Sequence, residues 1–528
     1  MENQEETIKK RKDKIKGWFK DPYNLTFFAI ILFAIAIRFY YFWLTKNQPI
    51  WWDESEYMSA AKSFLGIVNY QVGGQRLPGF PALVALFFAI GIKNEAVLRF
   101  FLCFIPSLLV IFLTYFTLKK MYADKKIALI STAIITVLWE HLFYSNRFHT
   151  ENLALFFELL AIAVLFCCYL KKQNLFFIKA KYSLIWVILF CIASFIIRPG
   201  NLIFIPAVFV FILILNIPLL FGSKKKSIIT LLVFLALIII LIFILSNISR
   251  FPMFGSYYHP QDPISWSNLT VFYGFYESLV SGIPSLLFYF FLIGLILFCL
   301  DLYLLYPRLK KINRNSEDLE FKSDIFNILL ILSVLFFFIF MIRPASYEFR
   351  WFFPLLLGML AFTSKGIIKS SEFIESLFKI KNLSVFLIII IVLIGAYTQY
   401  YHADQVIKSK LDSYSQVRDA ALWIKNNYPK NTQVLSISYP QTVYYSERNV
   451  STYSLIKNSS EFNKYLASNK PEILEVSIFE THPEWINSWI NDNKNRLTPI
   501  NAYFIDRQKT QPVLVLYKIE YNNTSKSA

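Results

Sequence analysis

Long apolar stretches alternate with short polar segments over the first 400 residues of the chain. A helix needs about twenty apolar residues to cross the hydrocarbon of a bilayer. The pattern predicts about eleven transmembrane helices, over 24–45, 97–118, 127–145, 150–170, 182–198, 201–221, 227–248, 283–305, 325–342, 351–364 and 383–400. A shorter apolar run, "PGFPALVALFFAIG" at 78–91, has a length more typical of an interfacial helix than of a spanning one.

Clusters of lysine and arginine between these runs set the expected topology. They lie at 9–20, 119–126, 171–181, 224–226, 308–322 and 365–381. If 78–91 lies flat on the membrane, all six clusters fall on one side, and cytoplasmic loops are the ones that carry excess positive charge. We therefore expect a cytoplasmic N-terminus, a flat 78–91 helix on the outer surface, and an outer location for everything after about 401.

The last part of the chain has a different pattern, in which amphipathic helices alternate with short apolar strands. The segment 414–429 predicts a helix ended by Pro429, and strands are predicted over 432–438, 472–480, 501–506 and 512–519. We expect three parts: a cytoplasmic basic tail (1–23), a transmembrane domain (24–400) and an extracytoplasmic α/β domain (401–528).

Composition supports a multi-pass protein of the cell membrane. Hydrophobic residues make up 56% of the 528 and charged residues only 17%. The net charge of +18 could indicate a nucleic-acid partner, but the positive residues lie between apolar runs, where they set topology. We therefore expect membrane lipids, and no nucleic acid, among the partners.

Acidic and basic residues gather at the predicted outer ends of the helices. Asp53, Glu54 and Glu56 follow the first apolar run, and other outer ends carry Arg76, Arg147, His149, Glu151, Arg198, Arg343, Glu348 and Arg350. Ionisable residues at membrane depth usually face a cavity or a partner. The pattern predicts a shared polar chamber, although Asp53 and Glu56 also have the spacing of a helix capping box.

Transfer of a sugar from a lipid phosphate fits these residue types. The phosphate leaves without needing a proton, and arginines can bind it and stabilise the charge that develops. The acceptor hydroxyl has a high pKa and needs a carboxylate to take its proton in the transition state.

The quoted segments "WWDESEYMSAAKSF", "QRLPGFPALVALFFAIG" and "RFHTENLALFF" together resemble the protein O-mannosyltransferase and aminoarabinose lipid A transferase families. These belong to the C-type glycosyltransferase superfamily. The resemblance implies two juxtamembrane helices in the first outer loop, an outward-facing site, a polyprenyl- or dolichyl-phosphate-linked donor and inversion at the anomeric carbon. It further implies a hexosyl- or pentosyltransferase.

We assign roles to individual residues from the chemistry of sugar transfer and from the family resemblance. Asp53 is the expected catalytic base, and Glu54 and Glu151 position the acceptor or the sugar, or help to hold Arg76. The candidate phosphate ligands are Arg76, Arg198, Arg350 and Arg343. Gln75 stands where the aminoarabinose enzymes carry an acid, so the need for a divalent metal ion stays open.

Other points also stay open at this stage. The acceptor is a protein, a lipid or a polysaccharide. The "WWD" at 51–53 lies in the first loop rather than in the C-terminal part, which disfavours transfer of a whole oligosaccharide. A transporter or flippase of a polyprenyl-linked sugar, or a non-catalytic membrane scaffold, would share the basic cavity.

Overall fold

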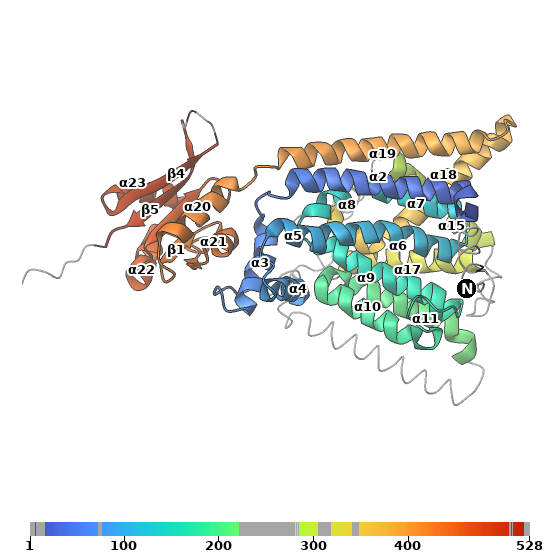
Figure 1. The fold of residues 1–528 in the computed structure, drawn as a ribbon, viewed down its shortest axis with the longest axis horizontal. Helices are drawn as coiled ribbons and strands as arrows, with labels where there is room; N and C mark the ends of the chain where they lie inside the picture. Colours follow the sequence, from blue (N-terminus) through green and yellow to red (C-terminus); the bar gives the residue numbers. More distant parts are fainter. Residues whose placement is uncertain are drawn as a thin grey trace, which may run out of the picture.

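A computed structural model describes residues 16–71, 76–220, 285–304, 318–340, 348–505 and 510–521, with a few isolated positions besides. The chain forms a bundle of long helices and a smaller unit containing a β-sheet, which lies at one end of the bundle (Figure 1). The predicted span over 227–248 and the candidate residue Arg343 lie outside the described residues.

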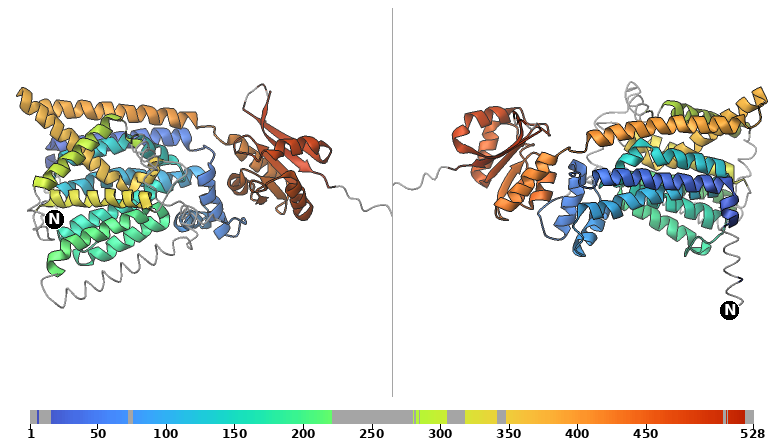
Figure 2. Two further views of the ribbon diagram at one scale, coloured as in Figure 1. Left: turned by 180° about the vertical axis from the view of Figure 1, so that it is seen from behind. Right: turned by 45° about the horizontal axis from the view of Figure 1, so that its top comes forward.

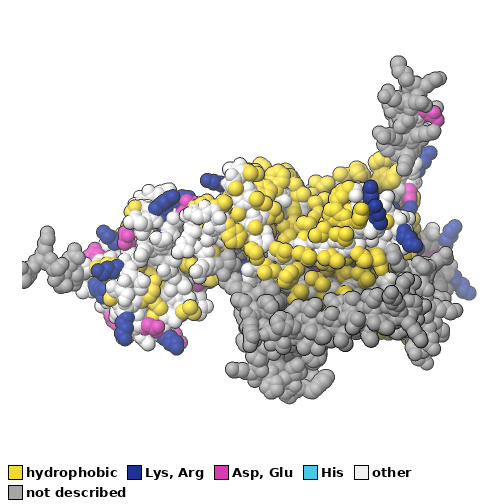
Figure 3. Space-filling view, turned by 90° about the horizontal axis from the view of Figure 1, so that it is seen from below, with side chains coloured by type: hydrophobic (Ala, Val, Ile, Leu, Met, Phe, Trp, Pro, Cys, Tyr) yellow, Lys and Arg dark blue, Asp and Glu magenta, His cyan; other side chains and the backbone are white. Residues whose placement is uncertain are grey.

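Seven helical segments in the described residues are long and apolar enough to cross a membrane, and a bent pair would make an eighth. Apolar side chains cover a broad area of the bundle's flank, while charged side chains lie toward its ends and on the smaller unit (Figure 3). The predicted class of polytopic helical protein is confirmed. The bundle helices are α2 (Pro22–Thr45), α5 (Glu95–Arg99), α6 (Ile105–Tyr122), α7 (Lys125–Val137), α8 (Trp139–Phe143), α9 (Glu151–Val164), α10 (Ser183–Ile197), α11 (Phe204–Leu220), α15 (Ser285–Leu304), α17 (Leu319–Phe340), α18 (Leu356–Phe378) and α19 (Leu383–Ser409).

Two short helices, α3 (Trp52–Phe64) and α4 (Gly79–Ala89), lie at the end of the bundle that faces the smaller unit (Figures 1 and 2). The helix α4 coincides with the apolar run expected to lie flat. The helix α3 begins one residue after Trp51, whose backbone N–H donates to Glu54 at 2.8 Å. The predicted capping pair of Asp53 and Glu56 is therefore wrong, because Glu54 occupies that role and leaves Asp53 for other contacts.

The predicted helix over 127–145 is broken, since α7 and α8 meet at a bend of 55°. A break inside a bundle leaves backbone carbonyls without helical partners. Here the fully buried Arg38 of α2 donates to the Thr136 carbonyl at 2.8 Å, and its other terminal nitrogen lies 2.8 Å from His141 Nδ1. The break redirects the chain into the loop that carries the acidic start of α9.

The C-terminal unit contains a five-stranded sheet in the order β2-β1-β3-β5-β4. Strands β2, β1 and β3 are parallel, and β5 pairs antiparallel with both β3 and β4. Four strands match the predicted ones, while β2 was missed because it has only three residues. The elements are α20 (Ser415–Asn427), β1 (Gln433–Ser436), α21 (Tyr439–Ser446), β2 (Asn449–Ser451), α22 (Ser459–Asn469), β3 (Ile473–Ser477), α23 (Trp485–Asp492), β4 (Leu497–Phe504) and β5 (Pro512–Ile519).

The two parts of the molecule are joined through α3 and α21. The Ser59 hydroxyl donates to the Pro440 carbonyl at 3.0 Å, and the Ile50 backbone N–H donates to the Tyr445 hydroxyl at 3.0 Å. Buried Ala60 of α3 belongs to the same apolar cluster as core residues of the C-terminal unit. The position of α3 therefore depends on both parts.

Among the described residues of the C-terminal unit, Glu475 in β3 carries a carboxyl group buried in the sheet core. The side chain is buried and accepts a hydrogen bond from the Thr442 hydroxyl at 2.9 Å, while its Oε1 atom has no partner among the described residues. Burial raises the pKa of Glu475 from 4.5 to about 8, although the hydrogen bonds from Thr442 and Ser436 oppose the shift. The unfolded chain thus loses this proton at a pH several units lower than the folded chain does.

We predict that the C-terminal unit loses stability as the pH rises from about 5 to about 8. Over that range the folded state binds the Glu475 proton and the unfolded state does not, so its unfolding free energy falls by up to about 1.4 kcal/mol per pH unit. Glu475→Gln removes this slope. Pulse proteolysis in urea, on the full chain in mild detergent, measures the unfolding free energy at each pH. An equal pH dependence in the wild type and in the variant would contradict the assignment of this effect to Glu475.

Candidate active site

Asp53, in the first turn of α3, holds two arginines that come from distant parts of the chain. Its Oδ1 atom lies 2.8 Å from Arg76 Nη2, and its Oδ2 atom lies 2.8 Å from Arg350 Nη1. These three side chains are 20–26% exposed, so they are sheltered yet reachable from solvent. The carboxylate is thus shared between two guanidinium groups.

Arg76 is fixed by further contacts with α3. Its Nε atom pairs with Glu56, its Nη1 atom donates to the Tyr57 hydroxyl at 2.9 Å, and its guanidinium carbon lies 4.7 Å from the centre of the Tyr57 ring. Asp53, Glu56 and Tyr57 lie on neighbouring turns of one helix face, since residues three and four apart face the same way. That spacing allows one arginine to be held by all three.

A second group of charges continues from Arg350 into the bundle. Arg198 Nη2 donates to the Arg350 carbonyl at 2.6 Å and lies 3.5 Å from Glu151 Oε1. Glu151 Oε2 lies 3.6 Å from His149 Nδ1, and Arg350 Nε lies 2.5 Å from Glu348. The buried Arg198 Nη1 atom has no hydrogen-bond partner among the described residues. The site therefore contains a guanidinium with hydrogen-bonding capacity still available.

Glu54 points away from this group and is completely buried. It accepts from the Phe148 backbone N–H at 2.8 Å and from Arg147 at 3.2 Å, and it lies 3.5 Å from Arg99 Nη1. Burial raises the pKa of Glu54, but the two arginines outweigh this effect and lower it. The hydrogen bonds of Glu54 therefore hold α3 against the loop before α9.

The charges around Asp53 determine its protonation. Burial raises the pKa of Asp53, but the nearby Arg76, His149 and Arg350 outweigh this and lower the pKa to about 2. The ion pairs of Asp53 therefore contribute stability above its usual pKa of 3.8, and this contribution is lost as the pH falls through about 2. At neutral pH the group is a carboxylate.

The structure brings together five of the seven candidates, which are Asp53, Arg76, Glu151, Arg198 and Arg350. Glu54 lies beside them but is enclosed by structural contacts. Arg99, which completes those contacts, was missed by sequence reasoning because it stands at the start of the apolar run 97–118. Its fully buried guanidinium also donates to the carbonyls of Asn146 and Gln48.

The described residues do not fit a metal ion. No group of three or more His, Cys, Asp and Glu side chains among them is arranged to hold one. Both carboxylate oxygens of Asp53 face arginines, so positive charge already occupies the positions that a cation would take.

Comparison with solved structures gives matches that cover most of this chain. ArnT from Cupriavidus metallidurans in the apo state matches with a TM-score of 0.56 and 11% identity, over 96% of this chain and 98% of that one. The same protein bound to undecaprenyl phosphate matches with a TM-score of 0.55 and 10% identity, over 93% and 97%. AglB, the oligosaccharyltransferase of Archaeoglobus fulgidus, in complex with an inhibitory peptide and a dolichol-phosphate, gives 0.56 and 13%, over 87% and 70%.

The chain shares its fold with ArnT and with AglB. The predicted resemblance is thereby confirmed for the fold. No protein-family model matches the chain, and no curated protein matches it either. Identities this low establish a shared fold and nothing more, so the chemistry has to be argued from the side chains of the site.

We predict that Glu54→Gln destabilises the protein by about 3–5 kcal/mol, because it removes the carboxylate that pairs with the buried Arg99 and Arg147. Thermal unfolding of the detergent-purified protein measures this. Asp492→Asn, an equal charge change at an exposed site, should stay within about 0.5 kcal/mol. Unchanged stability of Glu54→Gln, with a raised KM for an acceptor, would instead support the predicted role in positioning the acceptor.

Proposed function

We propose that this protein is an inverting glycosyltransferase, which moves a sugar from a polyprenyl- or dolichyl-phosphate-linked donor to an acceptor at the outer face of the membrane. The acceptor is a hydroxyl or an amine-bearing group on a glycan, lipid or protein. The observation that carries this proposal is the Asp53 carboxylate between Arg76 and Arg350. It combines a base and two phosphate ligands at the end of a helical bundle.

The solved structures with the same fold support the class of donor. One contains undecaprenyl phosphate and another contains a dolichol-phosphate, both of which are lipid phosphates. Guanidinium groups bind phosphate oxygens in pairs and retain their charge at any physiological pH. Arg76, Arg350 and Arg198 are therefore the proposed ligands of the donor phosphate, while Arg343 keeps its role only as a sequence prediction.

In the proposed reaction, an acceptor oxygen attacks the anomeric carbon as the bond from that carbon to the phosphate oxygen breaks. The electron pair of that bond leaves with the lipid phosphate, whose developing charge the arginines stabilise. The acceptor proton passes to Asp53. Attack on the face opposite the phosphate inverts the configuration at the anomeric carbon.

The low pKa of Asp53 couples donor binding to activation of the base. A carboxylate with a pKa of about 2 is a weak base while both arginines hold it. When the donor phosphate binds Arg76 and Arg350, their interaction with Asp53 weakens and its pKa rises. The base thus gains strength only in the complex that can react, which limits unproductive proton transfer.

Glu151 has a supporting role in this scheme. It lies 3.5 Å from Arg198 Nη2, and a carboxylate so placed orients the guanidinium toward the ligand. Arg198 Nη1, buried and without a described partner, is the atom proposed to reach the phosphate. Glu151 also lies where it can accept hydrogen bonds from sugar hydroxyls.

The proposed location follows the distribution of charge. The start of α2, which follows the basic tail 1–23, lies at the opposite end of the bundle from the sheet-containing unit (Figure 1). We propose that the tail is cytoplasmic and that residues 401–528 form the extracytoplasmic part, beside the outward-facing site of the domain 24–400. The protein is then a multi-pass protein of the cell membrane.

Asp53→Asn should lower the rate of sugar transfer at least about 100-fold, because the amide cannot accept the acceptor proton. The assay uses purified protein in lipid vesicles with a labelled lipid-phosphate sugar, and thermal unfolding confirms that the variant is folded. Asp412→Asn, the same change at an exposed position, should transfer at the normal rate. Unchanged transfer by folded Asp53→Asn would remove Asp53 from the mechanism.

The same vesicles separate the other candidate functions. Movement of the labelled lipid across the bilayer without a new glycosidic bond would favour a transporter. Absence of both movement and transfer, for every acceptor class, would favour the scaffold.

A further inference from the structure

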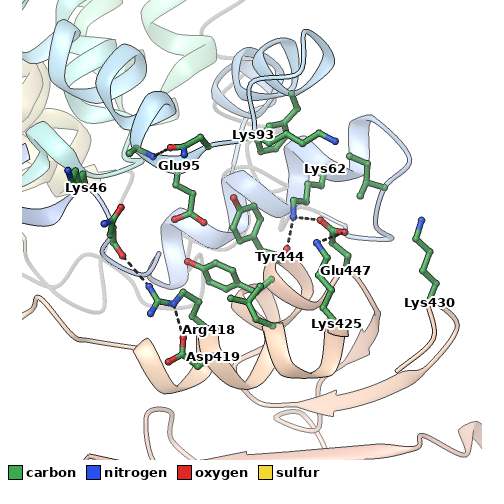
Figure 4. A pocket seen from close by; sticks show the side chains of 17 residues that line it. Lys46, Lys62, Lys93, Glu95, Arg418, Asp419, Lys425, Lys430, Tyr444 and Glu447 are labelled. Atoms are coloured by element: carbon green, nitrogen blue, oxygen red, sulfur yellow. Dashed lines mark hydrogen bonds and ion pairs between the residues drawn. The ribbon is translucent and has the colours of Figure 1, made fainter. Parts of the chain in front are cut away.

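A second charged cavity lies on the opposite side of α3 from Asp53. Lys62 follows Asp53 by nine positions, about two and a half helical turns, so the two side chains leave α3 in opposite directions. Around Lys62 lies a cavity of about 810 Å³, bounded by the bundle end on one side and by α20 and α21 on the other (Figure 4). This volume is within the range of small-molecule sites.

The lining of this cavity is strongly basic. Six cations line it, against the three acids Glu95, Asp419 and Glu447, which leaves an excess of three positive charges. Both parts of the molecule contribute three cations each, so the excess charge exists only where the parts meet. The six are Lys46, Lys62, Lys93, Arg418, Lys425 and Lys430.

One carboxylate of the lining is already held by two lysines of the cavity. Glu447 accepts from Lys62 at 2.7 Å and lies 2.8 Å from Lys425, so one carboxylate already bridges the two parts (Figure 4). Lys93 and Lys430 are exposed and make no hydrogen bond or ion pair with any described residue. Their ammonium groups remain available for a ligand.

The surroundings indicate the source of that ligand. Phe88 of α4 lines the cavity, and on the same helix Leu86 and Ile90 are 63% and 72% exposed. Exposed apolar side chains beside lysines are typical of a helix at a lipid surface. Lys46, at the end of α2, lies over the ring of Trp43, which is itself 64% exposed. Both features are typical of side chains at a membrane surface, which is where lipid phosphates lie.

We propose that this cavity binds a phosphate-bearing anion, supplied by the headgroup of an anionic membrane lipid, and that the bound anion links the C-terminal unit to α3. Compact ammonium groups can approach a tetrahedral phosphate from several directions, which suits a site built mainly from lysines. Such a site is separate from the donor site, because α3 lies between them.

The test is calorimetric titration of the full chain in neutral detergent with short-chain phosphatidylglycerol. We expect saturable binding that weakens at least tenfold in Lys93→Glu/Lys430→Glu and also falls with added salt. The matched control Lys464→Glu/Lys494→Glu changes two exposed lysines elsewhere on the C-terminal unit and should bind normally. Lys93→Gln/Lys430→Gln gives a milder test in case the charge reversal impairs folding.

Further titrations identify the ligand and distinguish this cavity from the donor site. Equal binding of glycerol 3-phosphate assigns the phosphate to a soluble ligand, whereas binding of the lipid alone assigns it to the membrane. Arg76→Gln should leave this binding unchanged, which distinguishes it from binding at the donor site. Equally tight binding of zwitterionic phosphatidylcholine would overturn the proposal. So would normal binding of phosphatidylglycerol by both Lys93→Glu/Lys430→Glu and Lys93→Gln/Lys430→Gln.

Discussion

One carboxylate shared by two arginines fixes the end of the bundle where α3 lies. Asp53 contacts Arg76, 23 residues later, and Arg350, 297 residues later, so that it ties the first polar loop to the last part of the bundle. A charge in this position at a membrane surface would be costly without such partners. The same contacts bring together the residues on which the proposed transfer from a lipid phosphate depends.

The neighbouring acid performs a separate task. Glu54 is enclosed by Arg99, Arg147 and backbone N–H groups, which hold α3 against the loop before α9. Adjacent residues of a helix point in directions about 100° apart. Glu54 can therefore be buried in structural contacts while Asp53, the proposed base, stays partly exposed to solvent.

Much of the helical architecture could be predicted from periodicity, because membrane spans need long apolar runs. The break at Leu138 could not, since it depends on Arg38 reaching the Thr136 carbonyl from another helix. The assembly of Asp53 with Arg76 and Arg350 was expected from topology. The division of roles between Asp53 and Glu54 was not, because the partner Arg99 lies in an apolar run and gives no signal until the helices pack.

In the proposed mechanism, Arg76 and Arg350 exchange the Asp53 carboxylate for the phosphate of a lipid-linked donor. The most direct measurement is an electron-cryomicroscopy structure of the protein in lipid nanodiscs with bound polyprenyl phosphate. The account predicts phosphate oxygens within hydrogen-bonding distance of both guanidinium groups, with Asp53 released and facing the position of an acceptor. A phosphate bound away from these arginines, with both ion pairs of Asp53 intact, would contradict it.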